Sequence, residues 1–321
     1  MPSSLLSILP RATSHVPALS AEVRELLAVQ PGDTVVDATF GAGGHASQLV
    51  EDAGAGGTLI AIDRDPAVRG DFDRFAQKTR TATRFLRGEF DVVLAQLAAN
   101  DMGADAILFD LGVSSMQIDQ PERGFSYAVD APLDMRMDPL SPVSAMEIVN
   151  ETGERELVDI LRRYGEERYA RQIAREIVHR RTERPYERTH DLVETVRNAV
   201  QAPRRFGDGH PAKRTFQALR IVVNDELSCL ERALPAALAI LRPGGRLAVI
   251  SFHSLEDRIV KRFLRTEARG CTCPPEFPVC TCGRTPTVRL LTRKALRPTA
   301  AEVAENPRAA SARLRVAQRQ D

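Results

Sequence analysis

Hydrophobic residues occur along the chain in two patterns, short apolar runs and longer stretches with helical spacing. Five runs are short and bounded by turn residues, which predicts buried strands; they lie at residues 34–39, 58–63, 83–88, 104–112 and 244–252. Helical patterns lie between most of them, and the first helix is predicted to begin with Ser20 as its N-cap. Strands that alternate with helices predict an α/β fold with a mainly parallel, doubly wound sheet. The alternating segment 311–319 is predicted to add an edge strand.

This alternation stops between the fourth and fifth predicted strands, where roughly a hundred residues intervene, far more than one crossover helix requires. Apolar stripes at 157–164, 170–178 and 192–200 have helical spacing, and Thr189 is a candidate cap for the third. We therefore expect an all-helical domain inserted into the α/β core. The predicted organisation is a flexible arm over 1–14, a discontinuous core over 15–130 and 218–321, and an inserted helical domain over 131–217.

The composition of the 321 residues limits the partners and the location. A net charge of +1 gives no overall attraction to nucleic acid, and 27% charged residues is ordinary for a globular protein. No apolar run approaches the ~20 residues of a membrane span, and the first residues lack a basic leader. Five cysteines, four of them within residues 271–282, do not match an extracellular disulfide framework. These features predict a cytosolic protein.

A glycine-rich turn follows the first predicted strand and opens a helix. Residues 41–46, Gly-Ala-Gly-Gly-His-Ala, fit the pattern G-x-G-x-x-A, in which glycines let the backbone approach a ligand. Asp63 lies 22 residues after Gly41, at the end of the next strand, where a carboxylate can accept hydrogen bonds from both ribose hydroxyls. By pattern alone the turn predicts a nucleotide-like ligand, a dinucleotide included.

Asp37 distinguishes between the candidate ligands. It lies just before the glycines, where a carboxylate would repel a pyrophosphate but tolerate a cation. S-adenosylmethionine (SAM) carries a ribose, an adenine, a sulfonium and an amino group, and it has no phosphate. Acids at three strand ends, Asp37, Asp63 and Asp110, therefore favour SAM over NAD. The alternative for Asp37 is a structural cap of the turn.

Several longer segments are more distinctive than the glycine turn. They are HVPALSAEV (15–23), DATFGAGGHA (37–46), DLGVSSMQIDQPERGFSYAVDAPLDMRMD (110–138), HPAKRTFQALRIVVNDEL (210–227), LRPGGRLAVISFHSLEDRIVKRF (241–263) and AENPRAASARLRVAQR (304–319). Through these segments the chain resembles the RsmH family, also called MraW, over nearly its whole length. That family consists of SAM-dependent methyltransferases acting on the exocyclic N4 of a cytosine in bacterial 16S rRNA, in the decoding region near the P site. Met116 is a departure, because many members have proline there.

The resemblance implies a class I, Rossmann-like SAM-dependent methyltransferase fold with an inserted helical substrate domain. Carried over by position, it implies SAM contacts at Gly43, Gly44, His45, Asp63, Phe90, Asp110 and Gln117. The residues themselves support Asp63 for the ribose, and Phe90 suits either stacking on adenine or packing in the core. His45 is equally suited to a helix start, and Gln117 rests on the resemblance alone.

Methylation of a cytosine amine needs positioning more than a protein nucleophile. The amine lone pair is delocalised and the sulfonium already activates the methyl group, so the site needs in-line placement and acceptors for the amine protons. The candidate catalytic residues are Asp110, Asp134 and His253. The alternatives are an ion pair of Asp134 with Arg136 and a helix-capping role for His253, and the sequence does not rank the three.

Two regions carry a local basic excess that suits binding to RNA phosphates. Residues 171–214 hold eleven basic against six acidic residues, and residues 284–321 hold nine against three. Within the first region, Arg204-Arg205-Phe206 and Lys213-Arg214-Thr215-Phe216 interleave basic and aromatic side chains, which favours stacking on unpaired nucleotides. Residues 166–188 match instead a solvated helix face with Glu–Arg pairs.

Cys271, Cys273, Cys280 and Cys282 are candidate ligands of a structural zinc ion, because four thiolates hold zinc tetrahedrally. Their C-x-C spacing is tighter than the usual C-x₂-C, so four reduced thiols on a proline-stiffened loop are the alternative. Cys229 lies on an apolar helix face and is predicted to be part of the core.

The sequence as a whole predicts a SAM-dependent 16S rRNA cytosine-N4 methyltransferase whose partner is rRNA within the small ribosomal subunit, with no binding to DNA or a membrane. The oligomeric state stays open, a homodimer included. Three alternatives remain: a methyltransferase for DNA cytosine or a protein amine, an RNA-binding assembly factor without activity, and an NAD-dependent oxidoreductase. Intact Gly43, Gly44, Asp63 and Asp110 disfavour the second, and Asp37 disfavours the third.

Overall fold

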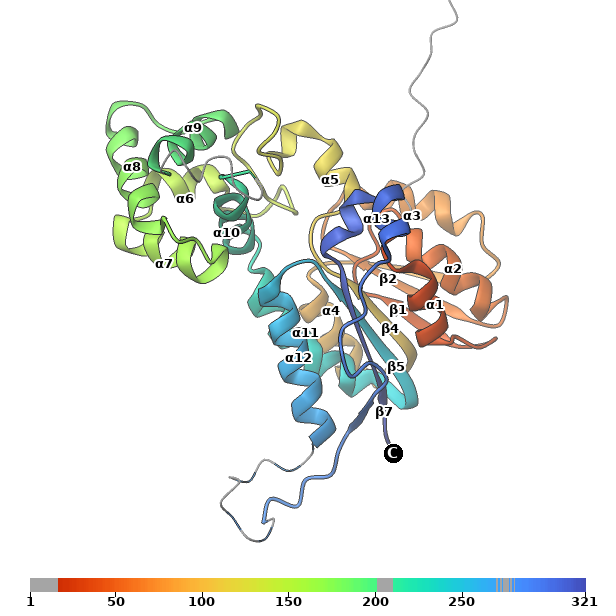
Figure 1. The fold of residues 1–321 in the computed structure, drawn as a ribbon. Coiled ribbons are helices and arrows are strands. Elements are labelled where there is room, and N and C mark those ends of the chain that lie inside the picture. Colours follow the sequence, from red (N-terminus) through yellow and green to blue (C-terminus); the bar gives the residue numbers. More distant parts are fainter. Residues whose placement is uncertain are drawn as a thin grey trace, which may run out of the picture.

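A seven-stranded sheet runs through the described part of the protein (Figure 1), in a computed structural model that describes residues 17–200, 210–269, 271, 273, 277, 279 and 281–321. The strand order is β3-β2-β1-β4-β5-β7-β6. The strands are β1 (Thr34–Asp37), β2 (Thr58–Asp63), β3 (Ala82–Arg87), β4 (Ala104–Asp110), β5 (Leu241–Ser251), β6 (Val288–Leu290) and β7 (Arg313–Arg319). Strands β1 to β5 are mutually parallel, and β7 is antiparallel to both of its neighbours. The predicted doubly wound sheet is therefore confirmed.

The strand predicted at 311–319 is confirmed as β7, but its predicted place at the edge of the sheet is wrong. Strand β7 lies between β5 and β6, and β6 is the outermost strand. The three residues of β6 are too few to produce an alternating pattern in the sequence, so only the tertiary structure reveals them.

Helices cover both faces of the sheet, because neighbouring side chains of each strand point to opposite sides. Val35 of β1 packs with α1 (Ser20–Leu27), α2 (Gly44–Ala53) and α3 (Val68–Ala76). Val36 packs on the other side, with α4 (Phe90–Ala99), α11 (Glu226–Ile240) and α12 (Ser254–Arg269). Both faces of the central strands are thus buried, which explains why their sequences read as continuous apolar runs.

A third hydrophobic core lies outside the sheet, in the green lobe of Figure 1. Its helices are α6 (Ala145–Glu151), α7 (Glu154–Gly165), α8 (Ala170–Glu183), α9 (Thr189–Ala199) and α10 (Lys213–Val223). The three predicted helical stripes form the buried faces of α7, α8 and α9. We call this lobe the helical insertion; its predicted limits at 131 and 217 stay a prediction.

Two shorter helices lie between β4 and the helical insertion, and two more lie between β6 and β7. They are α5 (Ser115–Asp119), η1 (Pro121–Arg123), α13 (Ala300–Glu305) and η3 (Pro307–Ser311). In the described part of the chain, none of the helices has the length and apolarity needed to cross a membrane. The arm predicted at 1–14 lies outside the described residues.

Two predicted helix caps are wrong. Helix α1 begins at Ser20, but its N-cap is Leu19, whose amide donates to Oε1 of Glu302 at 2.7 Å. The N-cap of α9 is Arg188, and the Thr189 hydroxyl instead joins the 129–131 segment, accepting from the Ala131 amide at 3.0 Å. In both cases the start of the helix contacts residues distant in sequence, Glu302 for α1 and the 129–131 segment for α9. Local capping rules do not include such contacts.

Candidate active site

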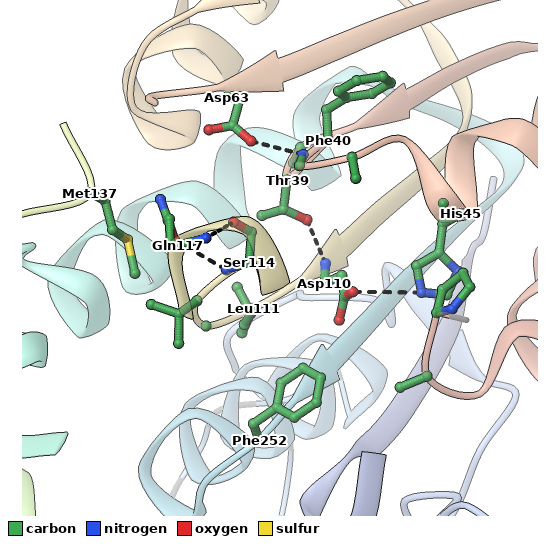
Figure 2. A pocket seen from close by; sticks show the side chains of 18 of the residues that line it. Thr39, Phe40, His45, Asp63, Asp110, Leu111, Ser114, Gln117, Met137 and Phe252 are labelled. Atoms are coloured by element: carbon green, nitrogen blue, oxygen red, sulfur yellow. Dashed lines mark hydrogen bonds and ion pairs between the residues drawn. The ribbon is translucent and has the colours of Figure 1, made fainter. Parts of the chain in front are cut away.

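A cavity of about 500 Å³ lies at the carboxyl ends of the central strands, where open α/β sheets bind their ligands. Its wall includes one carboxylate from the end of each of three strands: Asp37 from β1, Asp63 from β2 and Asp110 from β4. Figure 2 shows Asp63 and Asp110 with the side chains around them. The volume is in the usual range for a small-molecule site.

The glycine turn forms one side of this cavity. Gly43 has φ 75° in the left-handed region, and a Cβ there would lie 2.7 Å from Cζ of Phe40, so only glycine fits. Gly44 begins helix α2 and lines the cavity, so the free amides of the helix start lie at its wall. The turn is held closed by Asp63, whose Oδ2 accepts from the amide of Gly41 at 2.9 Å (Figure 2).

Asp37 is a buried carboxylate and Asp63 a half-buried one, and both accept hydrogen bonds from backbone amides. Burial raises the pKa of Asp37 to about 7 although its Oδ1 accepts from the Thr39 amide at 3.1 Å. Burial likewise raises the pKa of Asp63 to about 6, against the hydrogen bonds from Gly41 and Asp65 that lower it. Asp37 therefore caps the turn, the structural alternative weighed for it, and it also lines the cavity, while its contact with a cation stays a prediction.

Asp110 lies beside His45, and both line the cavity (Figure 2). Burial, the charge of Asp37 and the charge of Glu256 raise its pKa to about 8. Its Oδ2 lies 3.6 Å from Nε2 of His45, and its buried Oδ1 has no hydrogen-bond partner among the described residues. A buried carboxylate oxygen without a partner is costly, and a bound cation would remove that cost. The cavity therefore fits the sulfonium and ammonium groups of SAM.

Gln117 and Phe90 also line the cavity, so that Gly43 is the one predicted cofactor residue that is not among its lining residues. Gln117 belongs to the capping box of α5 with Ser114, and its Nε2 donates to Oδ2 of Asp65 at 2.9 Å. Phe90 packs edge-to-face on Phe109, with ring centroids 5.5 Å apart, and also lines the cavity. Both of the roles considered for Phe90 are thus compatible with its position. Its contact with adenine stays a prediction.

The three catalytic candidates are not brought together. Asp110 lines the cavity, whereas Asp134 and His253 are not among its lining residues. Asp134 pairs with Arg136 at 2.7 Å, and although burial opposes it, this guanidinium lowers the pKa of Asp134. Nε2 of His253 lies 3.1 Å from Oε1 of Glu256 at the start of α12, the capping position weighed as its alternative.

The sequence prediction missed a polar group on the cavity wall. It consists of Arg220, Glu226 and Glu256, with Phe252 beside them. Arg220 donates from Nε and Nη2 to the two carboxylate oxygens of Glu226, both at 2.8 Å. The signal available in the sequence was that these residues lie within the long segments 210–227 and 241–263.

The predicted RNA-stacking role of Phe216 is wrong, because its side chain is 3% exposed and packs in the core of the helical insertion. Lys213 and Arg214 beside it are exposed. The segment Arg204-Arg205-Phe206 lies outside the described residues.

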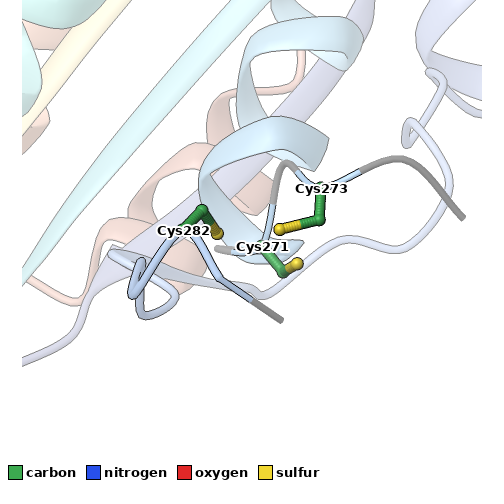
Figure 3. Close-up of side chains that lie close together, drawn as sticks. All are labelled: Cys271, Cys273 and Cys282. Atoms are coloured by element: carbon green, nitrogen blue, oxygen red, sulfur yellow. The ribbon is translucent and has the colours of Figure 1, made fainter. Parts of the chain in front are cut away.

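Three of the four clustered cysteines lie close together (Figure 3). The Sγ atoms of Cys271, Cys273 and Cys282 are within 4.8 Å of one another, while Cys280 lies outside the described residues. Hydrogen bonds from Thr281 lower the pKa of the Cys273 thiol. Cys229 is fully buried, as predicted, and burial raises the pKa of its thiol to about 12.

The sheet order and the acidic, glycine-lined cavity define a methyltransferase of the class I, SAM-dependent kind. The chain belongs to the MraW methylase family, whose family model matches residues 12–320.

Three similar proteins share the name "Ribosomal RNA small subunit methyltransferase H". The one from Rubrobacter xylanophilus is 52% identical over 309 residues, covering 95% of this chain and 96% of that protein. The relative from Symbiobacterium thermophilum is 51% identical over 306 residues (95% and 96%), and that from Heliobacterium modesticaldum is 50% identical over 308 residues (95% and 98%). Among solved structures, an rRNA methylase from Streptococcus thermophilus is 10% identical, with a TM-score of 0.40 over 94% of each chain.

Proposed function

We propose that the protein transfers a methyl group from SAM to the exocyclic N4 of a cytosine in the decoding region of 16S rRNA, near the P site. Membership of the MraW methylase family and the shared name of the relatives support a small-subunit rRNA substrate. The observation that carries the proposal is the Asp110 carboxylate, which lines the cavity with one buried oxygen that no described residue satisfies.

The residues around the cavity suit the parts of SAM. When bound, SAM supplies a methyl group already activated by its sulfonium charge. In our proposal the backbone of Gly43 and Gly44 approaches it, His45 borders it, Asp63 accepts hydrogen bonds from its ribose, and Phe90 stacks on its adenine, with Gln117 closing the far side. The carboxylates of Asp37 and Asp110 balance its positive charge.

Asp110 is also our choice among the catalytic candidates. A carboxylate at this position accepts a hydrogen bond from the target amine and holds its lone pair towards the methyl group. A pKa raised to about 8 lets the same carboxylate hold the proton that the amine loses. Asp134 and His253 then have supporting roles, in the ion pair with Arg136 and at the start of α12 respectively.

The proposed partner is the small ribosomal subunit, which places the reaction in the cytoplasm. The target base must leave its stack to reach the cavity, and the exposed Lys213 and Arg214 of the helical insertion would contact the RNA backbone. We propose neither DNA nor a membrane as a partner.

The test is transfer of labelled methyl from SAM to purified 30S subunits from cells that lack the gene. We expect one labelled cytosine in 16S rRNA, identified as N4-methylated by mass spectrometry of nuclease fragments, and no label in DNA of matched length. Label confined to DNA or protein, or absent from 16S rRNA, would contradict the proposal. Asp110→Asn is the variant expected to lose transfer, and Asp73→Asn, in an exposed pair with Arg69, is its control.

For the cysteines we propose a structural zinc site. The close approach of Cys271, Cys273 and Cys282 supports it, and Cys280 would be the fourth ligand. Protein purified without chelator should contain about one zinc per chain by elemental analysis, and Cys273→Ser should reduce this at least fivefold. Less than a tenth of a zinc per chain would remove the proposal and leave four reduced thiols.

A further inference from the structure

Two segments of the chain connect the sheet to the helical insertion, and both are hydrogen-bonded to the tripeptide Asp63-Arg64-Asp65 at the end of β2. The incoming connection passes through η1 and residues 133–137, and the outgoing one is the end of α10 with Asn224. Asp63, the first residue of the tripeptide, lines the cofactor cavity. Arg64 is hydrogen-bonded to the outgoing connection, and Asp65 to the incoming one.

Asp65 holds the incoming connection through Arg123. Nη1 of Arg123 donates to Oδ2 of Asp65 at 2.9 Å, and its Nη2 donates to the carbonyls of Arg136 and Met137 at 3.0 and 2.9 Å. The side chains of Arg123 and Asp65 are only 13% and 2% exposed. The planar fork of an arginine spreads its donors, so it can bridge a carboxylate and two carbonyls that lie apart, whereas a lysine ammonium donates from a single point.

Arg64 holds the outgoing connection through Asn224. Its Nη1 donates to the Asn224 carbonyl at 2.9 Å. The Asn224 side chain then joins this connection to the incoming one, because it donates to the Met135 carbonyl at 2.8 Å and accepts from the Met137 amide at 2.7 Å. Asn224 is 3% exposed, so these hydrogen bonds are shielded from water.

The same network reaches the cofactor cavity at three points. Oδ1 of Asp63 accepts from the Asp65 amide at 2.9 Å, Gln117 of the cavity wall donates to Oδ2 of Asp65 at 2.9 Å, and Met137 itself lines the cavity (Figure 2). A ligand that fixes Asp63 and Gln117 therefore also fixes the groups that hold Arg123 and residues 136–137.

We propose that Arg123 is a positioning residue that couples cofactor binding to the placement of the helical insertion, so that SAM and the RNA substrate bind cooperatively. When the cofactor orders Asp63 and Gln117, the hydrogen bonds from Arg123 to Asp65 and to residues 136–137 also order the segment that leads into the helical insertion. The RNA part of this inference rests on the proposed function, and the cofactor part does not.

The cofactor part is tested without RNA, by hydrogen–deuterium exchange with and without S-adenosylhomocysteine. In the unaltered protein the ligand should slow exchange at least tenfold at residues 133–137 and at the end of α10. Arg123→Gln should lose this effect at 133–137 while keeping the slowing in α2, beside the glycine turn. An unaltered protein whose insertion does not respond, or an Arg123→Gln variant that responds fully, would overturn the inference.

The matched control is Arg180→Gln. Arg180 is also a largely buried arginine joined to a carboxylate, with Nη2 2.7 Å from Oδ1 of Asp191, but both partners lie inside the helical insertion. This variant should keep the ligand-dependent slowing at 133–137. If Arg123→Gln does not fold, Arg123→Lys is used, which keeps the charge without the fork and is expected to lose the effect at 136–137; retention of the effect would overturn the inference.

The RNA part is tested by binding to unmethylated 30S subunits. S-adenosylhomocysteine should tighten binding of the unaltered protein by about 5- to 150-fold, the usual range of coupling between sites, and that of Arg123→Gln by less than twofold. Equal coupling in the two proteins, or none in either, would overturn the inference. Failure of the proposed function looks different, because the unaltered protein would then neither methylate nor specifically bind 30S subunits, while the exchange result would stand.

Discussion

Three aspartates give the cavity its chemistry at the scale of single residues. Each lies at a strand end, Asp37 buried and the other two half-buried, and their removal from water raises the pKa of Asp37, Asp63 and Asp110 to about 7, 6 and 8. An aspartate in an unfolded chain titrates near ~3.9, so the folded protein without ligand binds extra protons between about pH 4 and 8. Its stability therefore falls as the pH rises through that window, and a cation bound to the ionised carboxylates offsets the loss.

This linkage predicts that SAM affinity rises with pH. Between pH 6 and 8 a carboxyl with a pKa of about 7 goes from about a tenth to about nine-tenths ionised, so the association constant of SAM should rise at least about tenfold. Calorimetry at pH 6, 7 and 8 measures it. S-adenosylhomocysteine, which lacks the sulfonium charge, should show a smaller rise. An affinity that is flat with pH would contradict the assignment of these carboxylates to a cation.

The variant Asp110→Asn separates the effect of the carboxylate on stability from its effect on methyl transfer. The amide keeps the shape without the buried charge, so the ligand-free variant should melt a few degrees higher at pH 8, while methyl transfer falls at least about 100-fold. Thermal melts and 30S methylation measure the two effects. With Asp73→Asn, an exposed position, neither should change; a variant of Asp110 that melts lower and stays active would contradict this account.

At the scale of elements, the turn between β1 and α2 decides whether the cavity exists. Gly43 has a backbone conformation that favours glycine, and the buried ring of Phe40 fills the space that a Cβ would need. Asp63 holds the same turn through the Gly41 amide, so the cofactor loop and the end of β2 form one unit.

Gly43→Ala should therefore cost about 1–3 kcal/mol of stability and lower SAM affinity at least tenfold, because the turn must shift away from Phe40. Urea unfolding and calorimetry measure the two effects. Gly54→Ala is the control: Gly54 also has a positive φ, of 64°, but a Cβ there has nothing within 4 Å and the position is outside the cavity. Equal losses of SAM affinity in the two variants would contradict a specific role for the Gly43 turn.

At the scale of the whole molecule, the helical insertion has its own hydrophobic core, separate from the two cores on either side of the sheet. It is joined to the sheet by polar contacts: the network around Arg123 and Asn224, and Glu166, which accepts from Ser254 and Arg258 of α12 at 2.7 and 3.0 Å. Exposed ion pairs such as the one with Arg258 contribute little to stability, about 0–1 kcal/mol. The buried network around Arg123 and Asn224 is therefore the main contact that fixes how the helical insertion is oriented on the sheet.

A substitution in the core of the helical insertion should consequently destabilise the insertion and leave the sheet unchanged. Ile173→Ala, at a fully buried position of α8, should cost about 2–5 kcal/mol and speed hydrogen exchange in α7, α8 and α9, while exchange in α2 and α4 stays as it was. SAM affinity should change less than about threefold. The matched variant Ile60→Ala in the sheet should speed exchange in α4 instead. Uniform acceleration in both variants would contradict separate cores.

The sequence alone determined the alternation of the first five strands with helices, the helical stripes of the insertion and the three acids at strand ends. These depend on local periodicity and turn chemistry, which act between residues near in sequence. It did not determine that β7 is an inner strand, that Glu302 rather than a Ser20 cap meets the start of α1, or that Phe216 packs inward.

Only the tertiary structure decided which distant side chains share the cavity. It brings Arg220 and Glu256 to the cavity wall and joins Asp65 to Arg123. The physical reason is that these contacts form between segments tens to hundreds of residues apart. Their geometry is fixed by how the sheet and the helical insertion pack, which no local pattern encodes.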